Sequence, residues 1–184
     1  TVPDWCRSVE AELYNFKASA QLILHHATAP RSVHRYLVPE DMKSLLDYIA
    51  VEREAVFIAG GTDIMVQRNI SKKKFPVLID LCRVPELQKL YLQRDGLPIG
   101  ATVTYATLLA SGMVKTDYPA LHGLIKLIAS AQIRNFGTLA GNIANASPVG
   151  DTLPLLMVLN AELRLQSELE LRHLPLSEFF IGYR

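Results

Sequence analysis

The sequence AVFIAGGTDI, residues 55–64, joins a short apolar run to two adjacent glycines, a hydroxyl and a carboxylate. The apolar run predicts a buried strand that ends at Gly60-Gly61, followed by a short helix over residues 63–69. Glycine tolerates positive φ and lets another group approach the backbone closely, and consecutive N–H groups in such a turn can bind an anion. A plain tight turn with Thr62 or Asp63 as helix cap accounts for the same residues, so this stretch alone leaves both interpretations open.

The residues on either side of this turn predict a small parallel sheet. A second short apolar strand is expected over residues 76–81 (PVLIDL). Strand, helix and strand with continuous apolar runs imply parallel pairing, with both faces of the sheet covered. Residues 31–38 indicate a connecting strand or linker. Residues 39–41 (PED) then open another helix, because proline suits a first helical turn and acids suit the positive helix end.

An N-terminal helix is expected over residues 9–26, where apolar side chains recur at helical spacing. Its last two residues, His25 and His26, point in different directions on such a helix and make a poor pair of metal ligands. No other set of histidines and cysteines has the spacing of a metal site. We therefore predict no metal ligand.

The second half of the chain has the pattern of helices beside an antiparallel sheet. Residues 89–101 alternate around a central Arg-Asp-Gly turn and predict a hairpin. Helices are expected over residues 105–111, with Thr104 as the cap, and over residues 119–130, with Pro119 in the first turn.

The last part of the sequence predicts a helix, a strand and one more short helix. Asp151 is placed to cap a helix over residues 152–161, whose proline falls harmlessly in the first turn. Residues 162–174 are strand-like, and Ser177 is placed to cap the final EFFIGYR segment. Helices segregated beside an antiparallel sheet make this half α+β.

A second glycine-containing stretch, residues 137–151 (GTLAGNIANASPVGD), consists almost entirely of small and hydroxylic side chains. No lysine or arginine occurs between Arg134 and Arg164. A site that binds a diphosphate without cations must use backbone N–H groups, hydroxyls and amides instead. Asp151 offers a carboxylate for a ribose or ribityl hydroxyl, a role compatible with capping a helix. The two glycine stretches together therefore predict a dinucleotide between them.

Composition narrows the class of protein. The formal net charge is +1 and 49% of residues are hydrophobic, so charge gives no argument for nucleic acid or anionic membranes. Cys6 and Cys82 are the only thiols, too few for an iron–sulfur cluster, and they suit a reducing compartment. No apolar run approaches the roughly 18 residues of a membrane span. The cytoplasm is the expected location.

Other nucleotide and catalytic motifs do not occur in the sequence. There is no G-x-G-x-x-G and no G-x-x-x-x-G-K-[ST], so neither a Rossmann site nor a P-loop is predicted. G-x-S-x-G and H-E-x-x-H do not occur either. We predict no catalytic side chain.

Three motifs in fixed order resemble one known family. FIAGGTDI (residues 57–64), QIRNFGTLAGNIANASPVGD (residues 132–151) and EFFIGYR (residues 178–184) resemble the flavin domain of molybdenum hydroxylases. That family includes xanthine dehydrogenases and the medium subunits of carbon monoxide dehydrogenase-like enzymes. The resemblance covers roughly residues 31–184.

This resemblance implies an α+β, two-subdomain FAD-binding fold: a small parallel βαβ-type sheet followed by an antiparallel sheet with helices. Residues 31–85 would form the first subdomain and residues 86–184 the second, whose C-terminal part is expected to be missing. Residues 1–30 would be a helical extension or linker. FAD would lie, without a covalent bond, between the two subdomains.

The motif positions transfer the following cofactor-binding residues to this sequence. One side of the FAD would be lined by Phe57, Ile58, Ala59, Gly60, Gly61, Thr62, Asp63 and Ile64. The other side would be lined by Ala129, Gly137, Thr138, Gly141, Asn142 and Asp151. Arg134 stands where the family carries a basic residue near the flavin.

The resemblance also implies a function. The chain would be an electron-transfer flavoprotein component of an oxidoreductase, with the molybdenum cofactor and iron–sulfur clusters on partner subunits or domains. Electrons would reach FAD from the clusters and pass to NAD or another acceptor. A non-enzymatic assembly module without FAD and a stand-alone flavin oxidase remain as alternatives.

Overall fold

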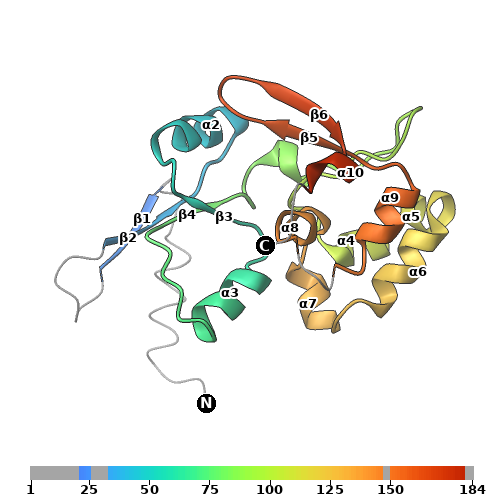
Figure 1. Ribbon diagram of the computed structural model, residues 1–184, viewed down its shortest axis with the longest axis horizontal. Helices are drawn as coiled ribbons and strands as arrows, with labels where there is room; N and C mark the ends of the chain where they lie inside the picture. The colour runs from blue at the N-terminus through green and yellow to red at the C-terminus, as the bar shows by residue number, and fades with distance from the viewer. Residues whose placement is uncertain (1–20, 26–32, 147–149, 181–184) are drawn as a thin grey trace, which may run out of the picture.

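The computed structural model describes residues 21–25, 33–146 and 150–180. The first part of the chain forms a four-stranded sheet with helices, and the second part forms a group of short helices with a two-stranded hairpin (Figure 1). The predicted α+β class, with a small parallel sheet followed by an antiparallel one, is confirmed. Within the described ranges, no helix is long and apolar enough to cross a membrane.

The larger sheet has the strand order β1-β2-β4-β3. Its parallel strands are β2 (Val33–Leu37), β4 (Val77–Asp80) and β3 (Val56–Ile58), with Phe57 opposite Ile79. The predicted parallel pairing of the strands before and after the glycine turn is confirmed. The carboxyl ends of all three strands meet at one edge of the sheet, the edge at which open α/β sheets bind ligands.

The remaining strand, β1 (Gln21–His25), pairs antiparallel with β2. The predicted helix over residues 9–26 is wrong for this segment, and the rest of that prediction lies outside the described residues. A short apolar run such as the one in QLILH cannot be assigned to helix or strand from spacing alone. Pairing with β2, from Gln21 opposite Leu37 to His25 opposite Val33, decides for a strand.

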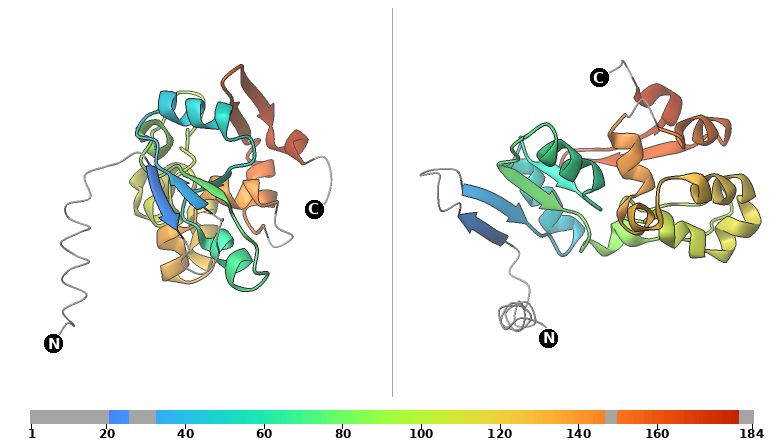
Figure 2. Two further views of the ribbon diagram at one scale, coloured as in Figure 1. Left: turned by 90° about the vertical axis from the view of Figure 1, so that its left-hand side faces the viewer. Right: turned by 90° about the horizontal axis from the view of Figure 1, so that it is seen from below.

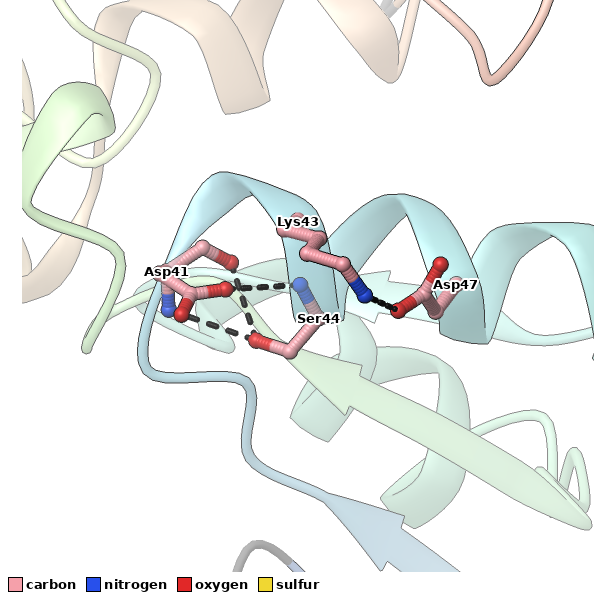
Figure 3. Close-up of polar contacts among 4 residues, drawn as sticks. All are labelled: Asp41, Lys43, Ser44 and Asp47. Carbon is pink, nitrogen blue, oxygen red and sulfur yellow. Dashed lines mark hydrogen bonds and ion pairs between the residues drawn. The ribbon is translucent and has the colours of Figure 1, made fainter.

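Helix α2 (Met42–Val51) begins at a reciprocal cap (Figure 3). Ser44 N–H donates to Asp41 Oδ1 at 2.7 Å, and the Asp41 N–H donates to Ser44 Oγ at 3.3 Å. The expectation that Pro39 lies in the first helical turn is wrong, because Asp41 is the cap and the buried Pro39 precedes it. The side-chain cap satisfies N–H groups that a helix leaves free at its start, and so fixes the first residue.

Helices α2 and α3 (Thr62–Asn69) lie on opposite sides of the sheet (Figure 2). On the α2 side, a small core forms from Leu37, Leu45, Ile79 and Val84. On the other side, α3 contributes no fully buried side chain. The short helix predicted after the glycine turn is confirmed. After β4 the chain continues through a 3₁₀ turn at Pro85–Gln88.

In the described residues of the second part, seven short helices and a hairpin pack around a separate core. The helices are α4 (Tyr105–Ala110), α5 (Gly112–Asp117), α6 (Pro119–Leu127), α7 (Ala131–Phe136), α8 (Leu139–Ala144), α9 (Leu153–Val158) and α10 (Leu176–Phe179). The hairpin consists of β5 (Glu162–Gln166) and β6 (Leu171–Pro175), with Arg164 opposite His173. The most deeply buried side chains in the core of this second part include Leu108, Val114, Ile125 and Leu176.

Thr104 caps α4 as predicted, because its hydroxyl oxygen accepts from the Thr107 N–H at 3.1 Å. The predicted cap at Asp151 is wrong. The capping position is Thr152, one residue later, and α9 begins at Leu153. The predicted cap at Ser177 is also wrong, because Pro175 precedes α10 and Ser177 lies inside it. Residues 181–184 of that segment lie outside the described residues.

Two regions differ from the expected regular elements. The predicted hairpin over residues 89–101 is present only as isolated antiparallel bridges, Leu90 with Ile99 and Gln93 with Gly96. Residues 131–144, to which the sequence assigned no regular element, form the two short helices α7 and α8. Small polar residues such as Ser130 and Thr138 cap these helices, so the composition typical of a loop here marks helix starts.

Candidate functional site

The two glycine-containing stretches are in direct backbone contact. A Cβ built at Gly60 would lie 1.7 Å from the carbonyl oxygen of Phe136 and 3.1 Å from the backbone nitrogen of Gly137. The β3–α3 turn therefore touches the junction between α7 and α8, which lie beside α3 in Figure 1. Glycine is required at position 60 because protein backbone occupies the space of its side chain.

Gly61 has a different role. It adopts φ +69° and ψ 2° and precedes α3 without any side-chain capping bond. The first backbone hydrogen bond of the helix is donated by the Met65 N–H to Gly61 O at 2.9 Å. The N–H groups ahead of Met65 form the uncapped, positive end of the helix dipole. This end of α3 is suited to an anion.

The side chains of the first turn of α3 support this polarity. The Asp63 carboxylate accepts a hydrogen bond from Gln67 Nε2 one turn later. It is therefore held against its own helix, where a negative charge near the start is favourable. Thr62 and Ile64 are half-buried, whereas Phe57 on β3 is exposed.

On the opposite side, Thr138 caps α8. Its Oγ1 accepts from the Gly141 N–H at 3.0 Å, and its side chain is buried. A Cβ at Gly141 would lie 2.9 Å from the same oxygen, so glycine leaves room for this cap. Thr138 was expected as a hydroxyl donor to a ligand, and the structure adds a capping role for its oxygen.

A buried polar group links α8 to the start of α9. Thr152 Oγ1 donates to Asn142 Oδ1 at 2.7 Å, and Thr152 is fully buried. Within the described part of the chain, the buried Tyr105 hydroxyl beside it has no hydrogen-bond partner. Burial raises the pKa of Tyr105 to about 12, and the charge of Asp151 adds to the rise. Asp151 itself is exposed.

Sequence reasoning did not select Thr152 or Tyr105. Threonine and tyrosine occur in many cores, and only the fold brings these two together with Asn142. The one available signal was the position of Thr152 directly after Asp151. Residues 147–149, between α8 and this group, lie outside the described residues.

Ala129 and Arg134 form a local structure of their own at the other end of α7. Arg134 Nη1 donates to the carbonyl oxygens of Ile128 at 2.9 Å and Ala129 at 2.8 Å. Ala129 adopts a positive φ of 47°, which is uncommon for a residue other than glycine. The guanidinium group therefore holds the loop between α6 and α7, and its donors at Nη1 are committed to that loop.

The arrangement fits an anionic dinucleotide better than a cationic or apolar ligand. It offers the free N–H groups of α3, the hydroxyl and amide groups of α8, and an exposed carboxylate at Asp151, with no cation between residues 134 and 164. A diphosphate needs donors, and backbone N–H groups at a helix start supply them without lysine or arginine.

Comparison with known proteins agrees with this chemistry. Residues 31–184 match the family described as the FAD binding domain in molybdopterin dehydrogenase, and the chain belongs to that family. Similar proteins include the xanthine dehydrogenase FAD-binding subunit of Escherichia coli O157:H7, 31% identical over 82% of this chain and 51% of that protein. The nicotinate dehydrogenase FAD-subunit of Eubacterium barkeri is 32% identical over 78% of this chain and 48% of that protein.

A solved structure shows the same fold. The chain resembles a carbon monoxide dehydrogenase from Hydrogenophaga pseudoflava, with a TM-score of 0.76 and 29% identity over 80% of this chain and 52% of that one. The chain spans about half the length of these separate subunits and 12% of the length of two plant xanthine dehydrogenases. The expected family and its FAD-binding fold are confirmed.

Proposed function

We propose that FAD binds, without a covalent bond, where the β3–α3 turn meets the α7–α8 junction. The observation that carries this proposal is the uncapped first turn of α3, held in backbone contact with Phe136 and Gly137. A diphosphate there would accept from N–H groups at the positive end of α3. The lining residues are those expected from the sequence: Phe57, Ile58, Ala59, Gly60, Gly61, Thr62, Asp63, Ile64, Ala129, Gly137, Thr138, Gly141, Asn142 and Asp151.

The two sides of this site would make different contacts with FAD. The α3 side would supply backbone donors to the diphosphate. On the α8 side, Asn142 uses its Oδ1 to accept from Thr152, so the amide N–H groups of its side chain point to a donor role. The exposed Asp151 carboxylate would accept from a ribose or ribityl hydroxyl. Every contact proposed here binds or orients the cofactor, and none transfers a proton.

The proposed activity is that of a flavin-dependent electron-transfer component of a molybdenum hydroxylase, xanthine dehydrogenase-like in its flavin domain. Bound FAD supplies the redox chemistry, taking up electrons and releasing them to NAD or another acceptor. The iron–sulfur clusters and the molybdenum cofactor would belong to partner subunits or domains. The family match and the relatives named as FAD subunits support this division of labour.

We propose that the oxidised substrate is chosen on a partner. The relatives that this chain matches carry the names of dehydrogenases for xanthine, nicotinate and carbon monoxide, although each is similar to the same chain. We also propose the cytoplasm as the location, on the grounds of the two-thiol composition.

Flavin content tests the core of the proposal. The purified chain, titrated with FAD and followed by flavin fluorescence, is expected to bind it with saturation. No binding by a folded chain would favour the assembly module. A second experiment adds xanthine, nicotinate or an aldehyde to the FAD-loaded chain without oxygen. The yellow absorption is expected to persist, and bleaching without partners would favour the stand-alone oxidase.

A further inference from the structure

We infer that Asp80 and Cys82 are positioning residues of the proposed FAD site, because they end a chain of hydrogen bonds that fixes the peptide just before Gly60. The inference rests on the proposed function. It assigns a task to residues outside both glycine stretches, at the carboxyl edge of the parallel sheet.

The chain of hydrogen bonds starts on β2 and crosses to the end of β4. Tyr36 OH donates to Asp80 Oδ2 at 2.6 Å, and the Cys82 N–H donates to Asp80 Oδ1 at 2.8 Å. The two oxygens of the Asp80 carboxylate therefore accept from different groups, one from the Tyr36 hydroxyl and one from the Cys82 N–H. Tyr36 and Asp80 stand at or next to the carboxyl ends of neighbouring strands. The Asp80 carboxylate therefore orients the first residues after β4.

From Cys82 the chain of hydrogen bonds reaches the end of β3. The backbone ladder between the two strands ends where the Leu81 N–H donates to Ile58 O at 2.9 Å. One residue beyond the end of β3, the Cys82 thiol donates to Ala59 O at 3.4 Å. The thiol therefore extends the pairing by one contact, to the peptide that joins Ala59 to Gly60. Gln88 Nε2 donates to Cys82 O and holds the Cys82 backbone from the other side.

The Tyr36 hydroxyl and the Cys82 thiol are both protonated, as hydrogen-bond donors must be. Burial, together with the Asp80 carboxylate, raises the pKa of the Tyr36 hydroxyl above its ordinary value. Cys82 is an exposed residue, but partial burial of its thiol and the same carboxylate raise the pKa of that thiol to about 12. Both groups keep their protons at neutral pH, so the hydrogen bonds persist there. A thiol with a raised pKa is also a poor nucleophile, which argues for a structural task.

The Ala59–Gly60 peptide is then held on two sides. The Cys82 thiol fixes its carbonyl, and the Phe136 carbonyl packs against the Gly60 α-carbon. The next residue, Gly61, adopts the positive φ that starts α3. The direction of the free N–H groups of α3 depends on this turn, so the hydrogen bonds from Tyr36 to Ala59 preorganise the proposed diphosphate donors.

The test compares FAD affinity in four variants of the full 184-residue chain. Cys82→Ala and Tyr36→Phe are each expected to weaken FAD binding about three- to tenfold, the value of one hydrogen bond. Cys82→Ser keeps a donor and is expected to restore most of the affinity. Tyr118→Phe, between α5 and α6, is the matched control and is expected to bind FAD as the parent does.

The double variant Tyr36→Phe/Cys82→Ala separates positioning from general weakening. Both residues act through one chain of hydrogen bonds. The double variant is therefore expected to lose no more FAD affinity than the weaker-binding single variant. A second readout uses a Cys6→Ser background and the rate of maleimide labelling at Cys82. FAD is expected to slow this labelling several-fold, and because Tyr36 and Cys82 are unchanged in this background, the result does not depend on how their variants fold.

The outcomes separate the two proposals. A folded parent that binds no FAD overturns the proposed function. A parent that binds FAD, with Cys82→Ala and Tyr36→Phe binding equally well, overturns only the positioning role. Additive losses in the double variant, or labelling of Cys82 at one rate with and without FAD, also contradict it.

Discussion

Arg53, in the loop after α2, forms an ion pair with Glu168, between the strands of the β5–β6 hairpin, with Nη2 and Oε1 2.7 Å apart. The hairpin extends from the second part of the molecule over the first, toward α2 (Figure 1). This contact and the Gly60–Phe136 contact join the same two parts at separate points.

The ion pair predicts a pH dependence of stability. A hydrogen bond from its own backbone N–H and the charge of Arg53 lower the pKa of Glu168 from its ordinary value of 4.5. A lowered pKa in the folded state adds stability above the ordinary pKa, and this stability is lost as pH falls through the folded value. The melting temperature of Glu168→Gln is therefore expected to lie below that of the parent at pH 7 and to converge with it below about pH 4.

Asp47→Asn is the matched control for this prediction, because its pair with Lys43 is exposed on one helix face. Exposed pairs contribute little, so its melting temperature should follow the parent at every pH. A constant gap between Glu168→Gln and the parent down to pH 3 would mean that the ion pair has no part in the difference.

Gly60→Ala is expected to be strongly destabilising. The new methyl group would lie 1.7 Å from the Phe136 carbonyl oxygen, and two backbone segments would have to separate. We expect a loss of about 2–4 kcal/mol in the free energy of unfolding, measured with urea. Gly123→Ala in α6 has open space at the same atom and should be neutral or stabilising by up to about 1 kcal/mol. Equal effects would disprove the close contact at Gly60.

Gly61→Val is expected to abolish FAD binding while the far-UV circular dichroism stays close to that of the parent. A β-branched residue does not tolerate the φ of +69°, so the turn must change and the α3 N–H groups must move. Gly61→Asn should bind FAD more tightly than Gly61→Val, because asparagine tolerates this region. Unchanged affinity in Gly61→Val would place the diphosphate elsewhere.

Thr138→Val is expected to lower the free energy of unfolding by about 1 kcal/mol, the value of a helix cap. The valine keeps the shape but cannot accept from the Gly141 N–H. If the Thr138 hydroxyl also donates to the diphosphate, FAD affinity falls roughly ten- to a hundredfold. Thr138→Ser should retain the cap. Isothermal titration of both variants measures the second effect, and wild-type affinity in Thr138→Val would remove Thr138 from the ligand contacts.

Tyr36→Phe is expected to lower the free energy of unfolding, whereas Tyr105→Phe is expected not to. Among the described residues the buried Tyr105 hydroxyl has no partner, so its removal should leave stability unchanged or raise it by up to about 1 kcal/mol. The Tyr36 hydroxyl donates to the Asp80 carboxylate, so its removal should cost about 1.5–3 kcal/mol. Urea denaturation of both variants checks the contrast. A large loss in Tyr105→Phe would reveal a partner for its hydroxyl.

The sequence was most informative where one local rule decides the structure. Two apolar runs around Gly60-Gly61 predicted β3, α3 and β4, and Thr104 predicted the start of α4. The rule failed at Gln21–His25, where pairing with β2 outweighed helical spacing. It gave no answer at residues 131–144, where α7 and α8 form, because small polar residues are typical of both loops and helix caps.

The candidate site was predicted as two separate stretches, and their contact could only come from the fold. Nothing in the residues near Gly60 indicates that its side-chain space belongs to the carbonyl of Phe136. The hydrogen bonds from Tyr36 through Asp80 and Cys82 to Ala59 join β2, β4 and the end of β3, and no local pattern in the sequence marks such a set.

The contact between Gly60 and Phe136 also bears on how the chain folds during synthesis. The ribosome releases the β3–α3 turn well before it releases α7, so the turn exists for a time without the backbone that it packs against. Over that interval the strands of the sheet can pair. Helix α3 has little packing to stabilise it, because it buries no side chain fully. The nascent chain would therefore gain the packed form of the β3–α3 turn, the proposed anion site, only after residue 137 has left the exit tunnel.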